Sequence, residues 1–291
     1  MRRAVTGPAP TLTRTLPRTL PRTLTVTLTL GLALLATTAA ADCSGAAGPC
    51  ELPGGSYHIL LPDGAKAPVP AILLLHGYGG AGLGMIRNTG MVNRMLGRGY
   101  AVIAPDGQKR ARGAGRDWDF HPDRPAARDE TAFLIAVADD AATCFGLQRD
   151  AMLLAGFSIG GSLTSYVACP TPDAFAAYAP VAGSFWRPHP TGCAGPVRLL
   201  HTHGTADRTV PLDGREIMPG LVQGNVFEAM EIWRLTNGCT PADRTESLGL
   251  YALQRWTDCL PGTDLRFALH EGGHSIPEGW AEMALDWFEA R

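Results

Sequence analysis

A serine between two glycines is the strongest chemical signal in this sequence. Residues 156–160 read GFSIG, which has the G-x-S-x-G spacing, and they lie between an apolar run at 151–155 and a helix-compatible stretch at 162–168. A strand, a sharp turn and a helix around such a serine form a nucleophile elbow, whose strain lifts the hydroxyl clear of the sheet. Glycines stand at 156 and 160, and we expect that side chains at these positions would collide with the neighbouring strand or helix. Ser158 is therefore the predicted nucleophile.

A serine hydroxyl needs a base, and the base needs an acid that orients it. Asp207 lies in HTHGTADRTVP (201–211) and His274 in HEGGHSIP (270–277), each in the loop after a predicted strand. The order serine, acid, histidine is that of the α/β-hydrolase triad. Asp213 and His270 are the alternatives. We favour Asp207 because Asp213 precedes a predicted helix start, and His274 because His270 ends the strand itself.

A glycine-rich segment follows the first strongly apolar strand. Residues 76–80 read HGYGG, and glycines allow backbone N–H groups to face a developing oxyanion. We assign the oxyanion hole to the amides of Tyr78 and Ile159, the latter being the residue after the nucleophile. The short motif alone recurs by chance, but these partners in order favour a serine hydrolase.

Other residues near the predicted site have weaker signals. Aromatic and basic side chains in loops are candidates for a substrate pocket, although loop aromatics commonly just cover a core: Trp118, Phe120, Trp186 and Arg187. Histidines at strand ends are expected to be structural hydrogen-bonding groups: His76, His201 and His203. No cysteine and histidine cluster has zinc spacing. A serine mechanism implies neither a metal nor an organic cofactor, so we expect none.

Predicted strands and helices alternate along the chain without internal repeats. Strands are expected at 56–61, 71–76, 100–104, 151–155, 175–181, 197–203 and 265–270, and helices at 84–97, 129–145, 162–168, 213–237 and 277–290. We interpret 56–61 as an edge strand and 239–259 as an excursion bounded by cysteines. The alternation predicts an α/β fold with a mostly parallel, doubly wound sheet. About 250 residues are enough for a single domain with a full core, which we place at 42–291.

The N-terminus predicts export. Five arginines and no acidic residue precede an apolar stretch at 24–38, and Ala39-Ala40-Ala41 offers a cleavage site, so residues 1–41 are a predicted signal peptide. Twin-arginine export through Arg2-Arg3 and lipid anchoring at Cys43 are less favoured alternatives. The apolar stretch is short for a membrane span. Mature protein is therefore expected outside the cell or in the periplasm.

Charge and cysteines restrict the partners further. Removing residues 1–41 lowers the net charge from −2 to −7, which argues against nucleic acid or an anionic membrane as partner. All seven cysteines lie in the exported part, where disulfides are permitted. Close spacing favours Cys43–Cys50 and Cys239–Cys259. Cys169–Cys193 would be a third pair, leaving Cys144 as a buried thiol.

The chain resembles the secreted α/β-hydrolases grouped as polyhydroxybutyrate-depolymerase-like and feruloyl-esterase-like enzymes. The matching segments are LLLHGYGG (73–80), LLAGFSIGGSLTSYVAC (153–169), FAAYAPVAG (175–183), HTHGTADRTVP (201–211) and HEGGHSIP (270–277). The resemblance implies a secreted serine esterase that acts on a small or oligomeric ester through a Ser-His-Asp acyl-enzyme mechanism. The sequence stops after the predicted closing helix, so we expect no polymer-binding module. An acyltransferase or peptidase with the same triad, and a non-catalytic binding protein, are the alternatives.

Overall fold

The computed structural model describes residues 48–110, 113–241 and 244–290. The predicted signal peptide (1–41) lies wholly outside these residues. Of the predicted Cys43–Cys50 pair, Cys43 lies outside them.

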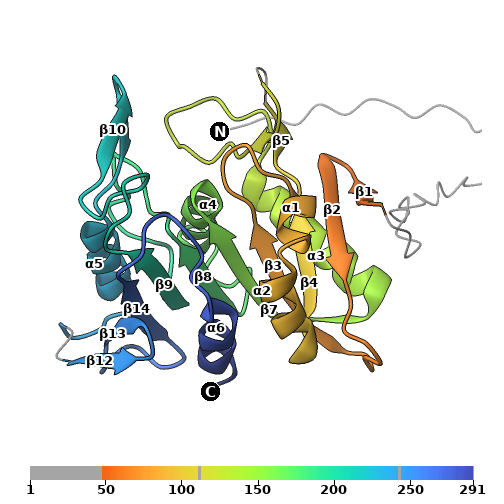
Figure 1. Ribbon diagram of the computed structural model, residues 1–291. Helices are drawn as coiled ribbons and strands as arrows, with labels where there is room; N and C mark the ends of the chain where they lie inside the picture. The colour runs from red at the N-terminus through yellow and green to blue at the C-terminus, as the bar shows by residue number, and fades with distance from the viewer. Residues whose placement is uncertain (1–47, 111–112, 242–243, 291) are drawn as a thin grey trace, which may run out of the picture. The chain divides into compact units, whose positions relative to one another are not determined.

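A ten-stranded sheet forms the centre of the described chain (Figure 1). Its strands, in spatial order, are β1 (Cys50–Leu52), β2 (Gly55–Leu60), β4 (Ala101–Pro105), β3 (Val69–Leu75), β7 (Leu147–Phe157), β8 (Ala177–Val181), β9 (Arg198–Gly204), β14 (Asp264–His270), β13 (Tyr251–Arg255) and β12 (Arg244–Leu248). The strands from β4 to β14 pair in parallel, and the pairs outside them are antiparallel. This confirms the predicted α/β fold with a mostly parallel sheet.

Helices cover both faces of the sheet, which explains why the central strands are apolar without alternation. The helices are α1 (Gly82–Ile86), α2 (Thr89–Gly97), α3 (Glu130–Phe145), α4 (Ile159–Ala168), α5 (Val226–Thr236) and α6 (Trp280–Glu289). One core unites buried side chains of α3, α4 and α5 with one face of the sheet. A second core unites α2 and α6 with the other face. In β3, Leu73 contributes to the first core and Leu74 to the second.

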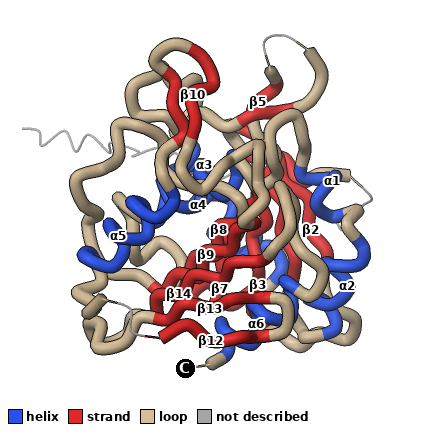
Figure 2. The backbone as a smooth tube through the Cα atoms, turned by 60° about the vertical axis from the view of Figure 1, so that its left-hand side comes forward, coloured by secondary structure: helices blue, strands red, loops and turns tan. Residues whose placement is uncertain are grey.

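Two small hairpins follow carboxyl ends of parallel strands. β5 (Gln108–Lys109) pairs with β6 (Arg116–Asp117) after β4, and β10 (Arg215–Met218) pairs with β11 (Leu221–Gln223) after β9. Figure 2 shows β5 and β10 at the same end of the sheet. The predicted helix over 213–237 was therefore wrong in its first part. Gly214 and Gly220 adopt positive φ angles of 75° and 78°, which end a helical path and permit the hairpin.

Two other expectations need correction. The strand at 56–61 is β2, which lies inside β1 and is not the edge. The segment bounded by Cys239 and Cys259 contains β12 and β13, which extend the sheet by antiparallel pairing with β14. β12 is exposed along its length, so its sequence lacks the apolar alternation that identifies a half-buried strand.

Two of the predicted disulfides are present, Cys169–Cys193 and Cys239–Cys259. Cys144, predicted to be buried, is exposed near the end of α3, where its thiol donates to the Asp140 carboxylate over 3.8 Å. The apolar face of α3 is formed by other positions, among them Val137 and Ala141, so Cys144 falls on the solvent side.

None of the helices in the described part of the chain is both long and apolar enough to span a membrane.

Candidate active site

Ser158 lies at the sharp turn between β7 and α4. Its φ is 59° and its ψ −123°, a backbone conformation that a residue with a side chain adopts only under strain. A Cβ atom at position 156 would lie 2.2 Å from the Gly160 carbonyl oxygen, and one at 160 would lie 2.6 Å from the carbonyl oxygens of Leu75 and His76. The glycines at both positions are thus explained by contact with the helix start and with β3, as the sequence predicted.

Three side chains far apart in the sequence form one hydrogen-bonded chain. His274 Nε2 lies 2.9 Å from Ser158 Oγ, and His274 Nδ1 lies 2.7 Å from Asp207 Oδ2. Because a carboxylate only accepts, Nδ1 carries the proton and Nε2 is the acceptor for the serine hydroxyl. Ser158 and Asp207 are buried, whereas the His274 side chain is 18% exposed. The arrangement can therefore remove a proton from Ser158 while remaining open to a substrate.

The loops that hold the acid and the base are joined to each other. Thr205 N donates to the His270 carbonyl over 2.7 Å, and Ala206 N donates to the Gly272 carbonyl over 3.1 Å. A Cβ atom at position 204 would lie 2.3 Å from the Gly272 oxygen. These contacts follow from the parallel pairing of β9 and β14, which brings both carboxyl ends to one edge.

The Asp207 carboxylate is also held by its own loop. Oδ1 accepts from the amides of Thr209 and Val210, both over 2.8 Å, and this leaves Oδ2 directed to His274. Asp213, the alternative acid, is exposed in the following turn. His270, the alternative base, accepts the Gly272 amide at Nδ1 over 3.0 Å.

The loop at 76–80 lies against Ser158, since a Cβ atom at position 77 would be 3.3 Å from Ser158 Cβ. Gly79 N donates to the Arg116 carbonyl and Gly80 N to the Gly77 carbonyl. Among the described residues, the amides of Tyr78 and Ile159 have no acceptor. These two unpaired donors are those predicted for the oxyanion hole.

His76 and Trp118 support this loop from below. Trp118 is 4% exposed, its ring centroid lies 4.7 Å from that of His76, and its Nε1 donates to the His76 carbonyl over 2.9 Å. Trp118 was a predicted pocket residue, and here it is part of the core beneath the loop. Burial lowers the pKa of His76, so the imidazole stays neutral.

Of the other predicted pocket residues, Phe120 and Trp186 lie beside α4, and Arg187 is bound to a residue of α5. Phe120 and Trp186 are half-buried, with ring centroids 5.8 Å apart, and Phe120 also contacts the Tyr166 ring at 5.3 Å. Trp186 Nε1 donates to Ser162 Oγ one turn beyond the nucleophile. Arg187 is exposed and pairs with both carboxylate oxygens of Glu228 at 2.9 Å. Phe120 and Trp186 thus remain the candidates for a pocket wall.

Two residues near Ser158 were missed by the sequence reasoning. The ring centroid of Phe157 lies 4.8 Å from that of His274 and so limits the movement of the imidazole. A Cβ atom at position 183 would lie 2.2 Å from the Ser158 carbonyl oxygen, so Gly183 permits the close approach of β8 to the elbow. Both residues lie inside segments quoted in the sequence analysis, Phe157 in 153–169 and Gly183 in 175–183, but nothing in those segments indicated their contacts with the site.

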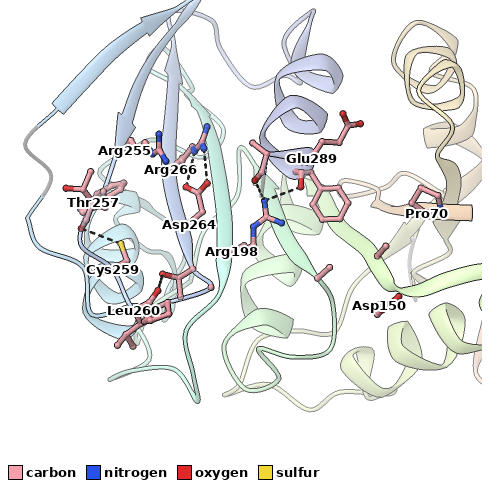
Figure 3. A pocket seen from close by; sticks show the side chains of 18 of the residues that line it. Pro70, Asp150, Arg198, Arg255, Thr257, Cys259, Leu260, Asp264, Arg266 and Glu289 are labelled. Atoms are coloured by element: carbon pink, nitrogen blue, oxygen red, sulfur yellow. Dashed lines mark hydrogen bonds and ion pairs between the residues drawn. The ribbon is translucent and has the colours of Figure 1, made fainter.

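A large groove of about 1060 Å³ lies elsewhere (Figure 3). Its lining includes Pro70, Arg198 and Asp264, which stand at or near the amino ends of β3, β9 and β14. The serine, acid and base all follow the carboxyl ends of parallel strands. The groove is therefore at the opposite edge of the sheet from the candidate site.

No group of three or more metal-binding side chains is found among the residues that the structure describes.

The family described as Esterase PHB depolymerase matches residues 55–192 of this chain. The match includes the 76–80 loop and Ser158, while Asp207 and His274 lie beyond it. This match spans slightly less than half of the chain, and with the relatives and solved structures below it indicates an ester hydrolase of the α/β-hydrolase fold. The part that matches holds the predicted nucleophile and the predicted oxyanion loop.

Curated relatives have related names. NocK of Nocardia uniformis subsp. tsuyamanensis, which is named as an esterase, is 29% identical over 245 residues, covering 75% of this esterase and 67% of NocK. Feruloyl esterase C of Emericella nidulans is 26% identical over 204 residues, covering 66% of each chain. Feruloyl esterase B of Piromyces equi is 30% identical over 144 residues but only 26% of its length is covered.

Solved structures share the fold. The acetyl xylan esterase from Aspergillus awamori has a TM-score of 0.61 at 16% identity, with 81% of this esterase and 94% of that chain covered. The carboxylesterase from Mesorhizobium loti has a TM-score of 0.57 at 19% identity, with 84% and 99% covered.

Proposed function

We propose that this esterase hydrolyses carboxylic esters through a covalent acyl-enzyme with Ser158 as nucleophile, His274 as base and Asp207 as orienting acid. The observation that supports it most directly is the continuous chain of two hydrogen bonds, 2.9 Å and 2.7 Å long, at the carboxyl edge of the sheet. We further propose that the protein acts after export, because it has two disulfides and an N-terminal sequence typical of a signal peptide.

The proposed first step is acylation. Ser158 Oγ attacks the ester carbonyl carbon as its proton passes to His274 Nε2, and Asp207 stabilises the imidazolium through Nδ1–H. The carbonyl oxygen becomes an oxyanion, and the amides of Tyr78 and Ile159 are the proposed donors that stabilise it. The C–O bond to the leaving alcohol then breaks, and the alcohol takes the proton from His274.

Deacylation repeats these events with water. His274 Nε2 accepts a proton from the water, the hydroxyl oxygen adds to the acyl carbon, and the bond to Ser158 Oγ breaks. Ser158 recovers its proton from His274, and a carboxylic acid is released. The three side chains therefore return to their starting protonation states.

The proposed substrates are small or oligomeric esters: hydroxybutyrate oligomers, feruloylated or acetylated sugars, or small lipophilic esters. The family match supports the first class and the feruloyl esterases support the second. The half-buried rings of Phe120 and Trp186 could line a pocket for an aromatic acyl group.

Hydrolysis of p-nitrophenyl butyrate, methyl ferulate and hydroxybutyrate oligomers by wild type and Ser158→Ala tests the proposal. We expect turnover by wild type that falls by about 10⁶-fold in Ser158→Ala, with Ser247→Ala, an exposed serine in β12, unchanged. Phenylmethylsulfonyl fluoride should add one adduct, which mass spectrometry places on Ser158.

Two results would contradict this proposal. No turnover of any ester by folded wild type would favour a binding protein. Turnover that yields an ester or amide of an added alcohol or amine, in preference to the free acid, would favour the acyltransferase alternative.

A further inference from the structure

The loop that holds Asp207 depends on a histidine that the proposed mechanism does not use. Val210 N donates to Asp207 Oδ1, and the Val210 carbonyl accepts a hydrogen bond from His203 Nε2 over 2.8 Å. One residue of the loop is thus bound to the acid by its N–H and to β9 by its C=O. His203 is completely buried in β9, only four residues before the acid.

The ring of His203 is in turn oriented by His201. His201 Nε2 lies 3.1 Å from His203 Nδ1, and the two rings are stacked with centroids 5.4 Å apart. The Val210 carbonyl can only accept, so His203 Nε2 carries the proton and Nδ1 is the acceptor. His201 must then donate from Nε2. A single carbonyl therefore determines the tautomers of both buried imidazoles.

His203 also faces the acid itself. Its Nε2 lies 3.7 Å from Asp207 Oδ2, the oxygen that accepts from His274 Nδ1. The other titratable groups near His203 are His201, His270 and His274. Burial lowers the pKa values of His201 and His203, so both are neutral at pH 7.

We propose that His203, oriented by His201, is a positioning residue that holds the Asp207 carboxylate in register with His274 Nδ1. This rests on the proposed esterase function of the same site. His203 touches neither substrate nor the reacting atoms, and it acts through the Val210 peptide and the acid.

The physical reason for a histidine at this position is the Val210 carbonyl. Val210 is 4% exposed, and an unpaired buried carbonyl costs about 1–3 kcal/mol. An apolar side chain at 203 would leave that carbonyl unpaired, so the loop would move to find a partner and would take the Val210 amide with it. Asp207 would then lose one of the two amides that fix its orientation.

Two substitutions separate positioning from packing. His203→Gln retains an N–H donor near the position of Nε2, whereas His203→Leu has a similar size and no donor. We expect His203→Leu to lower kcat by roughly 10- to 100-fold, the scale of a misplaced catalytic group, with KM within threefold of wild type. His203→Gln should remain within fivefold of wild type. The control is His58→Leu, in β2, which is separated from β9 by four strands of the sheet; its kcat should equal that of wild type.

A second measurement tests the position of Asp207 relative to His274 in the absence of substrate. The His274 Nδ1–H bound to a carboxylate should give a strongly downfield proton resonance in NMR, absent in His274→Gln. We expect this resonance in wild type and His203→Gln, and its shift or loss in His203→Leu. If His203→Leu does not fold, His203→Asn, which lacks a donor at the Nε2 position, is expected to lose the resonance and kcat in the same way.

The proposal is overturned if the donor-less variant keeps wild-type kcat and resonance, or if His203→Gln is as impaired as His203→Leu. The NMR arm does not need turnover. If wild type has the resonance but no esterase activity, the proposed function is contradicted. The NMR comparison of the His203 variants would still test whether His203 positions Asp207.

Discussion

The backbone N–H of Gly107 donates to Nε2 of His76 over 3.0 Å, which joins the loop after β4 to the loop after β3. Because Nε2 accepts, the proton is on Nδ1, and Nδ1 lies 2.8 Å from the Gly77 carbonyl. A Cβ atom at 107 would lie 3.0 Å from His76 Nε2, so glycine permits this bond. The neutral imidazole of His76 thus connects the Gly107 amide to the Gly77 carbonyl, and Gly77 directly precedes Tyr78, the proposed oxyanion donor.

Replacing His76 should impair the chemical step. His76→Leu removes both hydrogen bonds of the ring, so the Tyr78 amide should lose its fixed direction. We expect kcat for p-nitrophenyl butyrate to fall by about 10- to 100-fold, somewhat less than the loss of an oxyanion donor itself. Steady-state kinetics and thermal unfolding check this, and an unchanged kcat in a folded variant would show that the loop does not depend on His76.

Asp207→Asn should abolish most of the activity and leave the fold intact. The amide can still accept from Thr209 and Val210, but it no longer stabilises the imidazolium and it favours the wrong tautomer of His274. The expected loss in kcat is about 10⁴-fold. Asp213→Asn is the matched control, since Asp213 lies in the same loop region and is exposed, and it should stay within twofold of wild type. The opposite ranking of these two variants would assign the acid to Asp213.

Gly183→Ala should disrupt the nucleophile turn from the side of β8. The new Cβ would lie 2.2 Å from the Ser158 carbonyl oxygen and 2.4 Å from the Ser162 amide, and both are backbone atoms that cannot move independently. We expect a loss of stability of about 2–4 kcal/mol and loss of ester hydrolysis. Gly192→Ala is the matched control, because nothing lies within 4 Å of its Cβ. Urea unfolding and activity assays measure both, and equal stability of the two variants would contradict the argument.

The protein should lose stability as the pH falls below about 6.5, the ordinary pKa of histidine. Burial lowers the pKa values of His76, His201, His203 and His270 in the folded state. The unfolded chain therefore binds protons below about pH 6.5 before the folded chain does, and protonation favours unfolding. The stabilising contribution is complete above this pH and declines as the pH falls toward the folded-state values.

Urea unfolding at pH 7.5, 6.5 and 5.5 measures this decline. A fully buried histidine that remains neutral at pH 5.5 contributes a loss of about 1.4 kcal/mol at that pH. The slope should be shallower in His201→Gln, which removes one of the histidines whose pKa burial lowers. A free energy of unfolding that does not change over this range would show that these histidines bind protons as readily in the folded protein as in the unfolded chain, which contradicts the prediction.

The sequence by itself determined the fold class and the order of the chemical groups. Strands buried on both faces must be apolar throughout, so β3 and β7 could be recognised as continuous apolar runs. The turn after β7 requires glycines, which the sequence shows directly. Local rules of this kind need no knowledge of distant contacts. They do not define short exposed elements, which is why the β10–β11 hairpin was interpreted as a helix and β12 was missed.

Only the tertiary structure decided which groups meet. The sequence ranked Asp207 above Asp213 and His274 above His270, but the parallel pairing of β9 with β14 and of β7 with β8 sets the 2.7 Å and 2.9 Å distances between acid, base and nucleophile. The roles of Trp118 and His203 could not be predicted for the same reason. Their hydrogen-bond partners are backbone carbonyl oxygens, which every residue has, so the residue types do not indicate the pairing. Contacts between backbone atoms and distant side chains depend on how the loops pack, and this is fixed only when the whole sheet has formed.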